Sequence, residues 1–179
     1  MPKSIKPRGA CLRSLIPLLA VLMLPMLASA ASVTVPMSRI TADGTGESLG
    51  QIQFKEQDGH LVLLPALKGL SPGLHGFHIH ENPSCLPMEK DGRMTAGLGA
   101  GAHYDPDQSG KHLGPEGQGH RGDLAALSVS VDGTAASGII PVSRLSLNEL
   151  HGHSVIIHAD PDNYADQPGG ARIGCGLIP

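Results

Sequence analysis

Six histidines and one aspartate occupy four short segments of this chain, and both residue types bind transition metals. The segments are His78-Ile79-His80, His103, His112 with His120-Arg121-Gly122-Asp123, and His158. Imidazole nitrogens suit copper and zinc, whereas calcium and magnesium sites are built from oxygen atoms. Seven ligands exceed the four that one tetrahedral ion uses. The count therefore indicates two metal ions, or a ligand shared between them.

The two histidines of His78-Ile79-His80 stand two residues apart in a stretch with the character of a β-strand. Residues with this spacing project from one face of a strand, so both rings can grip one metal while Phe77 and Ile79 face the other way. An isolated pair of this kind is more often incidental. His158 ends the apolar run 154–158 and can supply a third ligand, or it is a core histidine with its hydrogen bonds satisfied.

The stretch from His103 to Asp123 carries a second set of ligands. His103, His112, His120 and Asp123 offer three imidazoles and one carboxylate within about twenty residues rich in turn formers. Three nitrogens and one oxygen match a closed tetrahedral zinc site. We expect this loop to wrap around one ion.

The elements that must position these ligands are short strands. Turn signals at Asp43-Gly44, Asp58-Gly59, Pro72-Gly73 and Asp132-Gly133 separate the apolar runs, and the second and fourth predict tight hairpins. Eight short strands predict an all-β sandwich or barrel. The predicted strands cover residues 32–40, 48–54, 60–67, 74–80, 124–131, 134–140, 154–158 and 171–178.

Two further features fit this fold class. Residues 81–123 form a long gap without clear periodicity, and loops of this length are usually functional or disordered. Aromatic residues make up only 2 % of the chain, while there are 24 Gly and 15 Pro, so aliphatic side chains must fill the core and the elements must be short.

The first thirty residues are organised as a secretory signal peptide. Four basic residues precede the apolar stretch Leu15 to Leu27, and Ala28-Ser29-Ala30 has the small-x-small form of a cleavage site. The stretch is short for a bilayer span. We therefore predict residues 1–30 as a cleaved signal and 31–179 as one mature domain without a membrane anchor; an uncleaved anchor is the alternative.

Removal of this segment makes the mature chain acidic. Four of the 13 Lys and Arg residues lie in it and none of the 16 Asp and Glu residues do, which leaves nine basic against sixteen acidic residues and a net charge of −7. No cluster of basic residues suited to phosphates is visible, so we expect no nucleic-acid partner. An anionic substrate would need a locally positive region.

Cysteine usage agrees with export. Cys11 lies within the predicted signal, so the mature chain keeps Cys85 and Cys175. In an oxidising compartment one intramolecular disulfide is the economical interpretation. A pair of thiols in the metal site is the alternative.

Four stretches of defined sequence occur in order: Gly73-Leu74-His75-Gly76-Phe77-His78-Ile79-His80-Glu81, Gly101-Ala102-His103-Tyr104-Asp105-Pro106, His120-Arg121-Gly122-Asp123-Leu124 and Gly169-Gly170-Ala171-Arg172-Ile173-Gly174-Cys175-Gly176. They resemble the signature stretches of copper/zinc superoxide dismutases of the bacterial exported type. The resemblance covers nearly all of residues 32–179. It implies an eight-stranded Greek-key β-barrel with long metal-binding and disulfide loops, located in the periplasm.

The resemblance also implies an activity, namely disproportionation of superoxide to dioxygen and hydrogen peroxide by redox cycling of a histidine-bound copper beside a structural zinc. It assigns His103 to both metals, as a bridging imidazolate that also supplies a proton, and it pairs Cys85 with Cys175 in the family's disulfide. The implied copper ligands are His78, His80, His103 and His158, and the implied zinc ligands are His103, His112, His120 and Asp123.

Three more residues receive roles from the resemblance. Arg172 matches the arginine that lies beside copper and attracts the anionic substrate, although an arginine taken at random is more often an ordinary surface residue. Asp162 matches the aspartate that links copper and zinc ligands, with Asp160 as a nearby competitor. His75 matches a histidine that packs beneath the copper ligands without binding metal.

The chain also departs from the animal-type enzymes. The segment 159–171 lacks their lysine and glutamate cluster, so the positive region must use other residues, for which Lys90 and Lys111 are candidates. His60, His151 and His153 have no assigned role.

The same residues bear on other functions and on the assembly state. A zinc hydrolase fits poorly because Glu81-Asn82-Pro83 follows the histidine pair, and a copper buffer or dismutase-like chaperone domain is the better alternative. A homodimer is compatible with the resemblance, since bacterial members include dimers and monomers.

Overall fold

The structure is a computed structural model that describes Met1 and residues 31–136, 138–164 and 169–179. The predicted signal peptide, apart from Met1, lies outside the described residues. Among the residues that are described, no helix is both long and apolar enough to cross a membrane.

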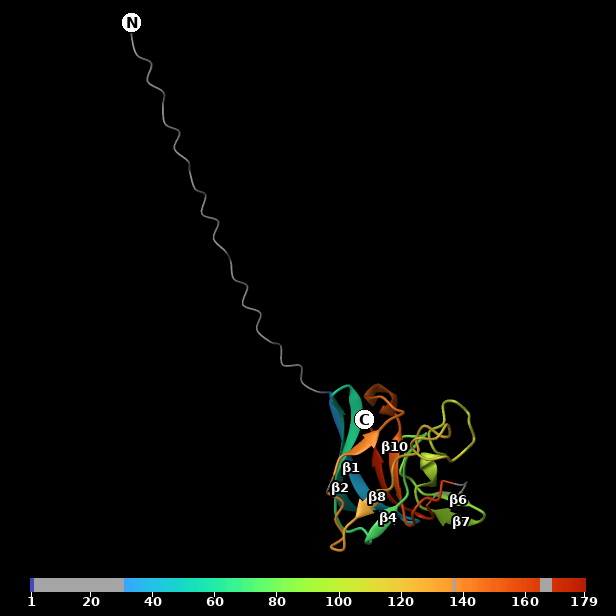
Figure 1. Ribbon diagram of the computed structural model, residues 1–179. Coiled ribbons are helices and arrows are strands. Elements are labelled where there is room, and N and C mark those ends of the chain that lie inside the picture. The colour runs from blue at the N-terminus through green and yellow to red at the C-terminus, as the bar shows by residue number, and fades with distance from the viewer. Residues whose placement is uncertain (2–30, 137, 165–168) are drawn as a thin grey trace.

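Short strands dominate the described residues, as the sequence predicts (Figure 1). Leu98–Ala100 and Leu147–Leu150 form two single-turn 3₁₀ helices, η1 and η2. The strands are β1 (Ser32–Thr41), β2 (Gly44–Gln57), β3 (His60–Leu67), β4 (Gly73–His75), β5 (Phe77–His80), β6 (Met88–Lys90), β7 (Arg93–Thr95), β8 (Leu127–Val129), β9 (Ile140–Val142), β10 (Ser154–His158) and β11 (Arg172–Leu177).

Strand pairing is antiparallel and runs around a curved sheet. The main sheet has the order β5-β10-β11-β1-β2-β3-β9, and β4 pairs separately with β8. Because β4 leads directly into β5, the β4–β8 pair continues the circuit beyond the edge of the main sheet. An isolated bridge between Leu67 and Ala135 joins the end of β3 to the segment that follows β8.

This circuit confirms the all-β barrel fold. Strand neighbours that are not consecutive in the chain, β5 with β10 and β3 with β9, are the crossings expected of a Greek key. The predicted turn at Asp58-Gly59 connects β2 to β3, and both of its residues have positive φ, 52° and 79°, as a type I′ hairpin turn requires.

The predicted strand 124–131 is reduced to β8, Leu127–Val129, and two other predicted strands are interrupted. The run 74–80 is broken at Gly76 into β4 and β5, because the Gly76 N–H bonds to the carbonyl of Asp160 at 2.8 Å and the Asp162 carboxylate fills the space where a side chain would stand. Among the described residues of the run 134–140, Ala135 forms an isolated bridge with Leu67 and Ile140 begins β9. At Gly76 tertiary contacts outweigh the local pattern.

The core lies inside the barrel and is largely aliphatic, as the composition predicts. Phe54 and Phe77 are fully buried in it among Leu, Ile and Val side chains. In β2 the side chains alternate, since Ile52 and Phe54 are buried whereas Gln51 is exposed and Gln53 is only partly buried. Burial of each such side chain stabilises the fold by about 1.5–3 kcal/mol.

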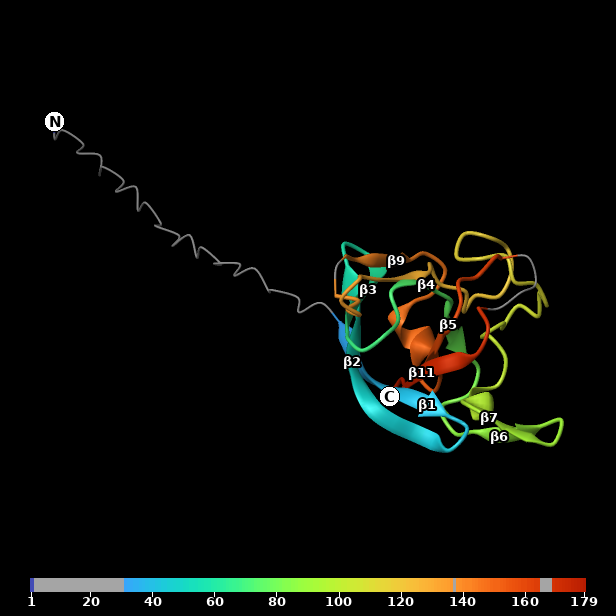
Figure 2. The same cartoon turned by 90° about the horizontal axis from the view of Figure 1, so that it is seen from below.

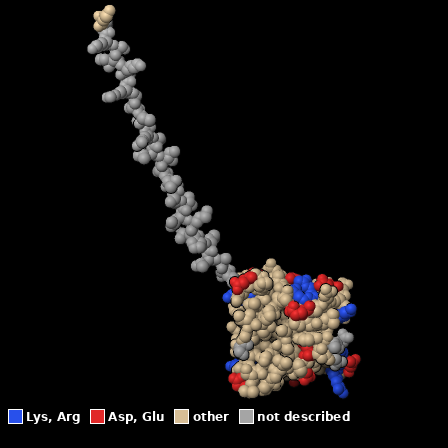
Figure 3. All heavy atoms as spheres, in the orientation of Figure 1, with Lys and Arg blue, Asp and Glu red and all other residues tan. Residues whose placement is uncertain are grey.

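The long segment between β5 and β8 gathers on one side of the barrel (Figures 1 and 2). It contains a hairpin that the sequence analysis did not predict, β6–β7, closed by Asp91-Gly92 with positive φ at both residues. On the face of the molecule in Figure 3, basic and acidic side chains are interspersed, without a continuous basic stretch.

Candidate metal centre

The centre is built on β5, which is paired along both edges. On one edge β10 places Ile156 opposite His78 and Ser154 opposite His80. On the other edge isolated bridges place Asp123 opposite His78 and His103 opposite His80. Residues directly opposite each other in antiparallel pairs project from the same face. Register alone therefore brings members of both predicted ligand sets, His78 and His80 with His103 and Asp123, to one face.

That face is the outer side of the barrel, beneath the long loop. Phe77 and Ile79 point the other way into the core, as the alternation predicts. Loop backbone secures the edge of β5, since the Ile79 N–H donates to the carbonyl of Gly122 and the Tyr104 N–H donates to the carbonyl of Ile79, both at 2.9 Å. The ligand-bearing loop is thus hydrogen-bonded to the strand that carries the first two histidines.

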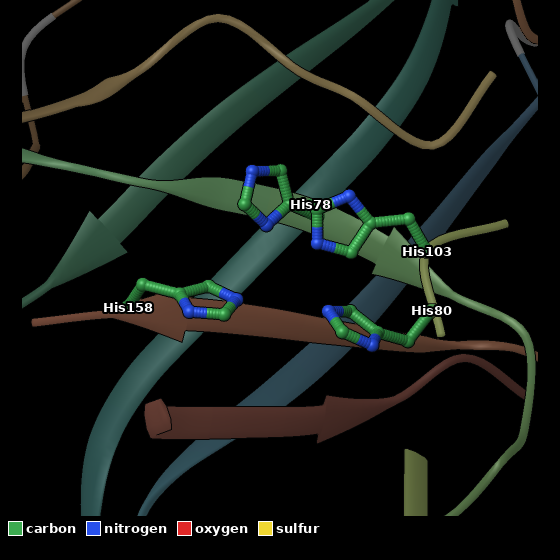
Figure 4. Close-up of side chains that lie close together, drawn as sticks. All are labelled: His78, His80, His103 and His158. Carbon is green, nitrogen blue, oxygen red and sulfur yellow. The ribbon is translucent and has the colours of Figure 1, made fainter. Parts of the chain in front are cut away.

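The first cluster, called the four-histidine group, consists of His78, His80, His103 and His158 (Figure 4). One ligand atom from each residue lies within 4.8 Å of the others. The ring centroids of His78 and His103 are 3.9 Å apart, and those of His78 and His158 are 4.8 Å apart. His158 comes from β10, two residues beyond Ile156 and on the same face.

The three strand histidines of this group, His78, His80 and His158, share one pattern. In each ring one nitrogen is hydrogen-bonded to an oxygen atom and the other nitrogen has no hydrogen-bond partner. His80 Nδ1 donates to the carbonyl of Gly101 at 3.0 Å, and His158 Nδ1 donates to the carbonyl of Gly170 at 2.9 Å. His78 Nε2 donates to Asp162 Oδ2 at 2.8 Å. The opposite nitrogens, His78 Nδ1, His80 Nε2 and His158 Nε2, are buried without a hydrogen-bond partner.

This pattern fixes the tautomers of His80 and His158, because a carbonyl oxygen can only accept a hydrogen bond, and an ionised Asp162 carboxylate does the same for His78. The held nitrogen carries the proton, so the buried one presents a lone pair. Metal-binding histidines characteristically donate their second N–H to a carbonyl or carboxylate. The residues of the four-histidine group therefore fit a bound metal ion.

The second cluster, called the Asp123 group, converges on one carboxylate oxygen. Asp123 Oδ1 lies 3.0 Å from His103 Nδ1, 2.9 Å from His112 Nδ1 and 3.5 Å from His120 Nδ1. In a tetrahedral zinc site with ligands about 2.0–2.1 Å from the ion, neighbouring ligand atoms stand roughly 3.3 Å apart. Both ring nitrogens of His112 and Nδ1 of His120 are buried without a hydrogen-bond partner. These distances to Asp123 suit ligands of one ion, but the set whose ligand atoms all lie within 4.8 Å of one another is His78, His103, His112 and Asp123, and His120 lies outside that set.

Asp162 stands between the two groups. Besides holding His78, its carboxylate lies 3.5 Å from His112 Nε2 and accepts the Gly169 N–H at 2.9 Å. Asp160, the alternative to Asp162, is exposed. Its backbone carbonyl accepts a hydrogen bond from the Gly76 N–H. The geometry therefore favours Asp162 over Asp160 as the linking residue.

His75 lies beneath the four-histidine group and is 1 % exposed. Its Nδ1 is 2.7 Å from the carbonyl of His158, and its Nε2 is 2.8 Å from the carbonyl of Ser71. Both ring nitrogens face backbone oxygens, so neither is available to a metal. Its position matches the expected structural role.

Burial keeps these histidines neutral. Desolvation lowers the pKa of His78 and His80 well below the ordinary histidine value. The neighbouring His103 and His158 lower the pKa of His78 further. Arg172 and His103 lower the pKa of His80 further. For His158 burial lowers the pKa to about 4, against a smaller opposing effect of the Gly170 carbonyl. Neutral imidazoles bind metals without first losing a proton.

Asp123 is held as a carboxylate. Burial raises its pKa, but the hydrogen bond from His103 and the neighbouring His112 outweigh that effect, and the pKa lies below its ordinary value. An ionised Asp123 among neutral imidazoles is the protonation state that a dication requires.

Arg172 lies on β11 at the rim of the centre. Its Nη1 donates to the carbonyl of Gly97 at 2.6 Å and its Nη2 donates to the carbonyl of Gly101 at 2.7 Å. A guanidinium has five N–H groups, so others remain for an anion. A cavity of about 410 Å³ connects Arg172 with members of both groups; it is lined by Ala102, His103, Gly110, His112, His120, His158, Gly170 and Arg172.

A disulfide joins Cys85 to Cys175, with 5.8 Å between their Cα atoms. It ties the start of the long loop to β11, three residues after Arg172. The predicted disulfide is present, and the alternative of two thiols at the metal site is wrong.

The remaining predicted residues lie outside the clusters. Lys90 on β6 and Lys111 in the loop are exposed, and neither lines the cavity. His60 and His151 are exposed, and His153 Nδ1 donates to the carbonyl of Glu81 at 2.9 Å. In the part of the chain that the structure describes, His60, His151 and His153 belong to neither group of potential metal ligands.

Comparison with known proteins agrees with this geometry. The chain matches the profile of the family described as "Copper/zinc superoxide dismutase (SODC)" over residues 48–178. The chain belongs to the copper/zinc superoxide dismutase family. Copper/zinc superoxide dismutases disproportionate superoxide with copper and zinc as cofactors, and this oxidoreductase activity is the function of the chain.

Individual members of the superoxide dismutase family are similar over most of their length. "Superoxide dismutase [Cu-Zn] 2" of Salmonella typhimurium is 47 % identical over 156 residues, which cover 84 % of this chain and 90 % of the relative. The structure of the Brucella abortus enzyme has a TM-score of 0.80 at 43 % identity and covers 83 % of this chain and all of its own. A Salmonella enterica enzyme described as monomeric has a TM-score of 0.73 at 48 % identity, with the same coverage.

Sequence reasoning missed two features of this dismutase site. The carbonyl of Gly101 accepts from both His80 and Arg172, so one backbone oxygen links the four-histidine group to the rim arginine. Tyr164 packs its ring 5.5 Å from the ring of His112 and donates to the carbonyl of Leu124. Backbone acceptors and single aromatic contacts leave no pattern in a sequence.

Proposed function

We propose that the four-histidine group holds the catalytic copper, that the Asp123 group holds the zinc, and that His103 is shared by both. The observation that carries the assignment is the set of buried, unpartnered nitrogens on His78, His80 and His158, each opposite a nitrogen held by an oxygen. Burial of a lone pair without a partner is costly unless a ligand satisfies it.

His103 is the residue placed to serve both ions. Its Nδ1 faces Asp123 at 3.0 Å, while its ring stacks on His78 at 3.9 Å and lies 4.9 Å from the ring of His80. One ring nitrogen thus belongs to the Asp123 group, and the ring as a whole belongs to the four-histidine group.

The reaction converts two superoxide ions and two protons to one dioxygen and one hydrogen peroxide. Copper, when bound, supplies the one-electron oxidation and reduction that this requires. His103 lines the cavity and its side chain is 9 % exposed, so a proton from solvent can reach its ring and pass to the reduced substrate. Asp123 and Asp162 hold the rings at fixed angles throughout.

Arg172 attracts and orients the anion. Two backbone carbonyls fix its guanidinium at the cavity rim, and the group stays charged at any relevant pH. In a mature chain with net charge −7, this local positive charge offsets the repulsion of the surface toward an anion. Steering of this kind depends on ionic strength.

The compartment of action is the periplasm, after export by residues 1–30. Support comes from the basic, apolar and small-residue segments of that region and from the Cys85–Cys175 disulfide, which suits an oxidising compartment. There the enzyme protects the exported compartment from superoxide. Cell fractionation tests this localisation, and light scattering of the purified protein distinguishes a homodimer from a monomer.

Metal analysis combined with a superoxide-consumption assay tests the function. We expect one copper and one zinc per purified mature chain, with turnover that a copper chelator abolishes. Copper bound without turnover would favour a copper buffer, and zinc bound alone without turnover would favour a non-enzymatic domain.

A further inference from the structure

Two arginines connect the zinc-binding loop to the segment that precedes β10, and each guanidinium holds the backbone around the other. Arg144 Nη2 donates to the carbonyl of Gly119 at 2.8 Å, and Arg144 Nη1 donates to the carbonyl of His120 at 3.2 Å. In return, Arg121 Nε and Nη2 donate to the carbonyl of Arg144 at 3.1 and 2.8 Å. We call this reciprocal arrangement the arginine clamp.

The clamp acts on the least supported residue of the Asp123 group. The side chain of His120 is 20 % exposed, against 9 % for His103 and 4 % for His112, and its Nδ1 is the farthest of the three from Asp123. No regular strand contains His120. The His120 N–H donates to the carbonyl of Lys111 at 2.8 Å, and the His120 carbonyl accepts from Arg144 Nη1 and from the Asp123 N–H. The preceding carbonyl, that of Gly119, accepts from Arg144 Nη2.

The other end of the clamp is fixed to the barrel. Arg121 pairs with Glu149 in η2, and Glu149 also accepts the N–H and hydroxyl of Ser146 in a capping box. Leu147 and Leu150 of the same turn are buried in the core. The Arg121–Glu149 pair therefore connects the zinc-binding loop to η2, a helical turn that is packed into the core.

We infer that Arg144, with Arg121, is a positioning residue for the zinc ligand His120. The planar guanidinium fork is suited to this task because it presents two parallel N–H groups to two successive carbonyls, which a lysine ammonium cannot match. Outer contacts of this kind typically change metal affinity by about 10–100-fold. The inference rests on the proposed zinc assignment.

The test is the rate at which zinc leaves the metal-loaded mature enzyme for a chromogenic chelator at pH 7. Arg144→Met should release zinc about 10–100-fold faster than wild type. Arg144→Lys should fall in between. Copper content should stay at the wild-type level in both variants, and the visible spectrum of Co²⁺ placed in the zinc site should change in Arg144→Met.

Arg39→Met is the matched control. Arg39 also donates to a loop carbonyl, that of Gly69, and also pairs with a glutamate, Glu47, but this contact lies in the connection after β3 and not in the zinc-binding loop. Its zinc release should equal that of wild type. Unchanged release from Arg144→Met, or equal acceleration in Arg39→Met, would overturn the inference.

Two further variants separate possible failures. If Arg144→Met does not fold, zinc release is measured in Arg144→Lys and Glu149→Gln instead. Release at the wild-type rate in both variants would contradict the positioning role of the clamp. If wild-type protein binds no zinc, or keeps zinc in Asp123→Ala, the zinc assignment itself fails. If zinc depends on Asp123 but not on Arg144, only the clamp fails.

Discussion

Acidification should destabilise the metal-free protein through His158. Its folded-state pKa is about 4, since burial disfavours the charged ring, whereas an unperturbed histidine has a pKa of about 6.5. Between these values the unfolded chain binds a proton that the folded protein does not bind. The free energy of unfolding is therefore fully retained above about pH 6.5 and falls as the pH drops toward 4.

The size of the effect follows from the shift. About 2.5 pKa units at about 1.4 kcal/mol each give roughly 3 kcal/mol in total, of which most is lost by about pH 4.5. His158 is 3 % exposed, so little of this is screened by solvent. The pKa values of His78 and His80 are lowered in the same direction and steepen the loss.

Urea unfolding of chelator-treated mature protein, with the disulfide intact, measures this free energy from pH 7.5 to 4.5. His158→Gln should show a shallower dependence on pH than wild type. His60→Gln, which removes an exposed histidine of β3, is the control. A free energy of unfolding that does not change with pH, or an equal slope in wild type and His158→Gln, would refute the reasoning.

Three more predictions concern the holoenzyme and its fold. Asp162→Asn should weaken metal binding by about 10–100-fold, measured by competition with chelators, because His78 loses its carboxylate partner; unchanged affinity would contradict the linking role. Arg172→Glu should lower the superoxide-consumption rate about tenfold or more at low salt with both metals bound, whereas Lys68→Glu, an equal charge change outside the cavity, should have little effect; equal rates in the two variants would refute steering. Cys175→Ser opens a disulfide between residues 90 apart in sequence and should reduce the free energy of unfolding by about 4 kcal/mol in urea titrations; a loss below about 1 kcal/mol would contradict the closed-loop account.

The sequence was sufficient to predict the fold class and to select the residues that cluster. Strand alternation placed Phe77 and Ile79 in the core and the neighbouring histidines outside it, and the structure agrees. The break between β4 and β5 at Gly76 could not be predicted from strand alternation. It depends on contacts with Asp160 and Asp162, which lie more than eighty residues later in the chain.

Two other features were beyond local pattern for different reasons. The β6–β7 hairpin carries an Asp91-Gly92 signal like that of Asp58-Gly59, but its strands of three residues are too short to show alternation. The clamp of Arg121 and Arg144 joins two loops 23 residues apart, and an arginine that bonds backbone carbonyls leaves no motif.

The most direct test is a crystal structure of the metal-loaded mature enzyme, with anomalous diffraction recorded at the copper and zinc absorption edges. The account predicts two peaks on either side of the His103 ring: copper against His78 Nδ1, His80 Nε2 and His158 Nε2, and zinc against the Asp123 group. A single peak, or a copper peak that His103 does not contact, would contradict the shared-histidine centre.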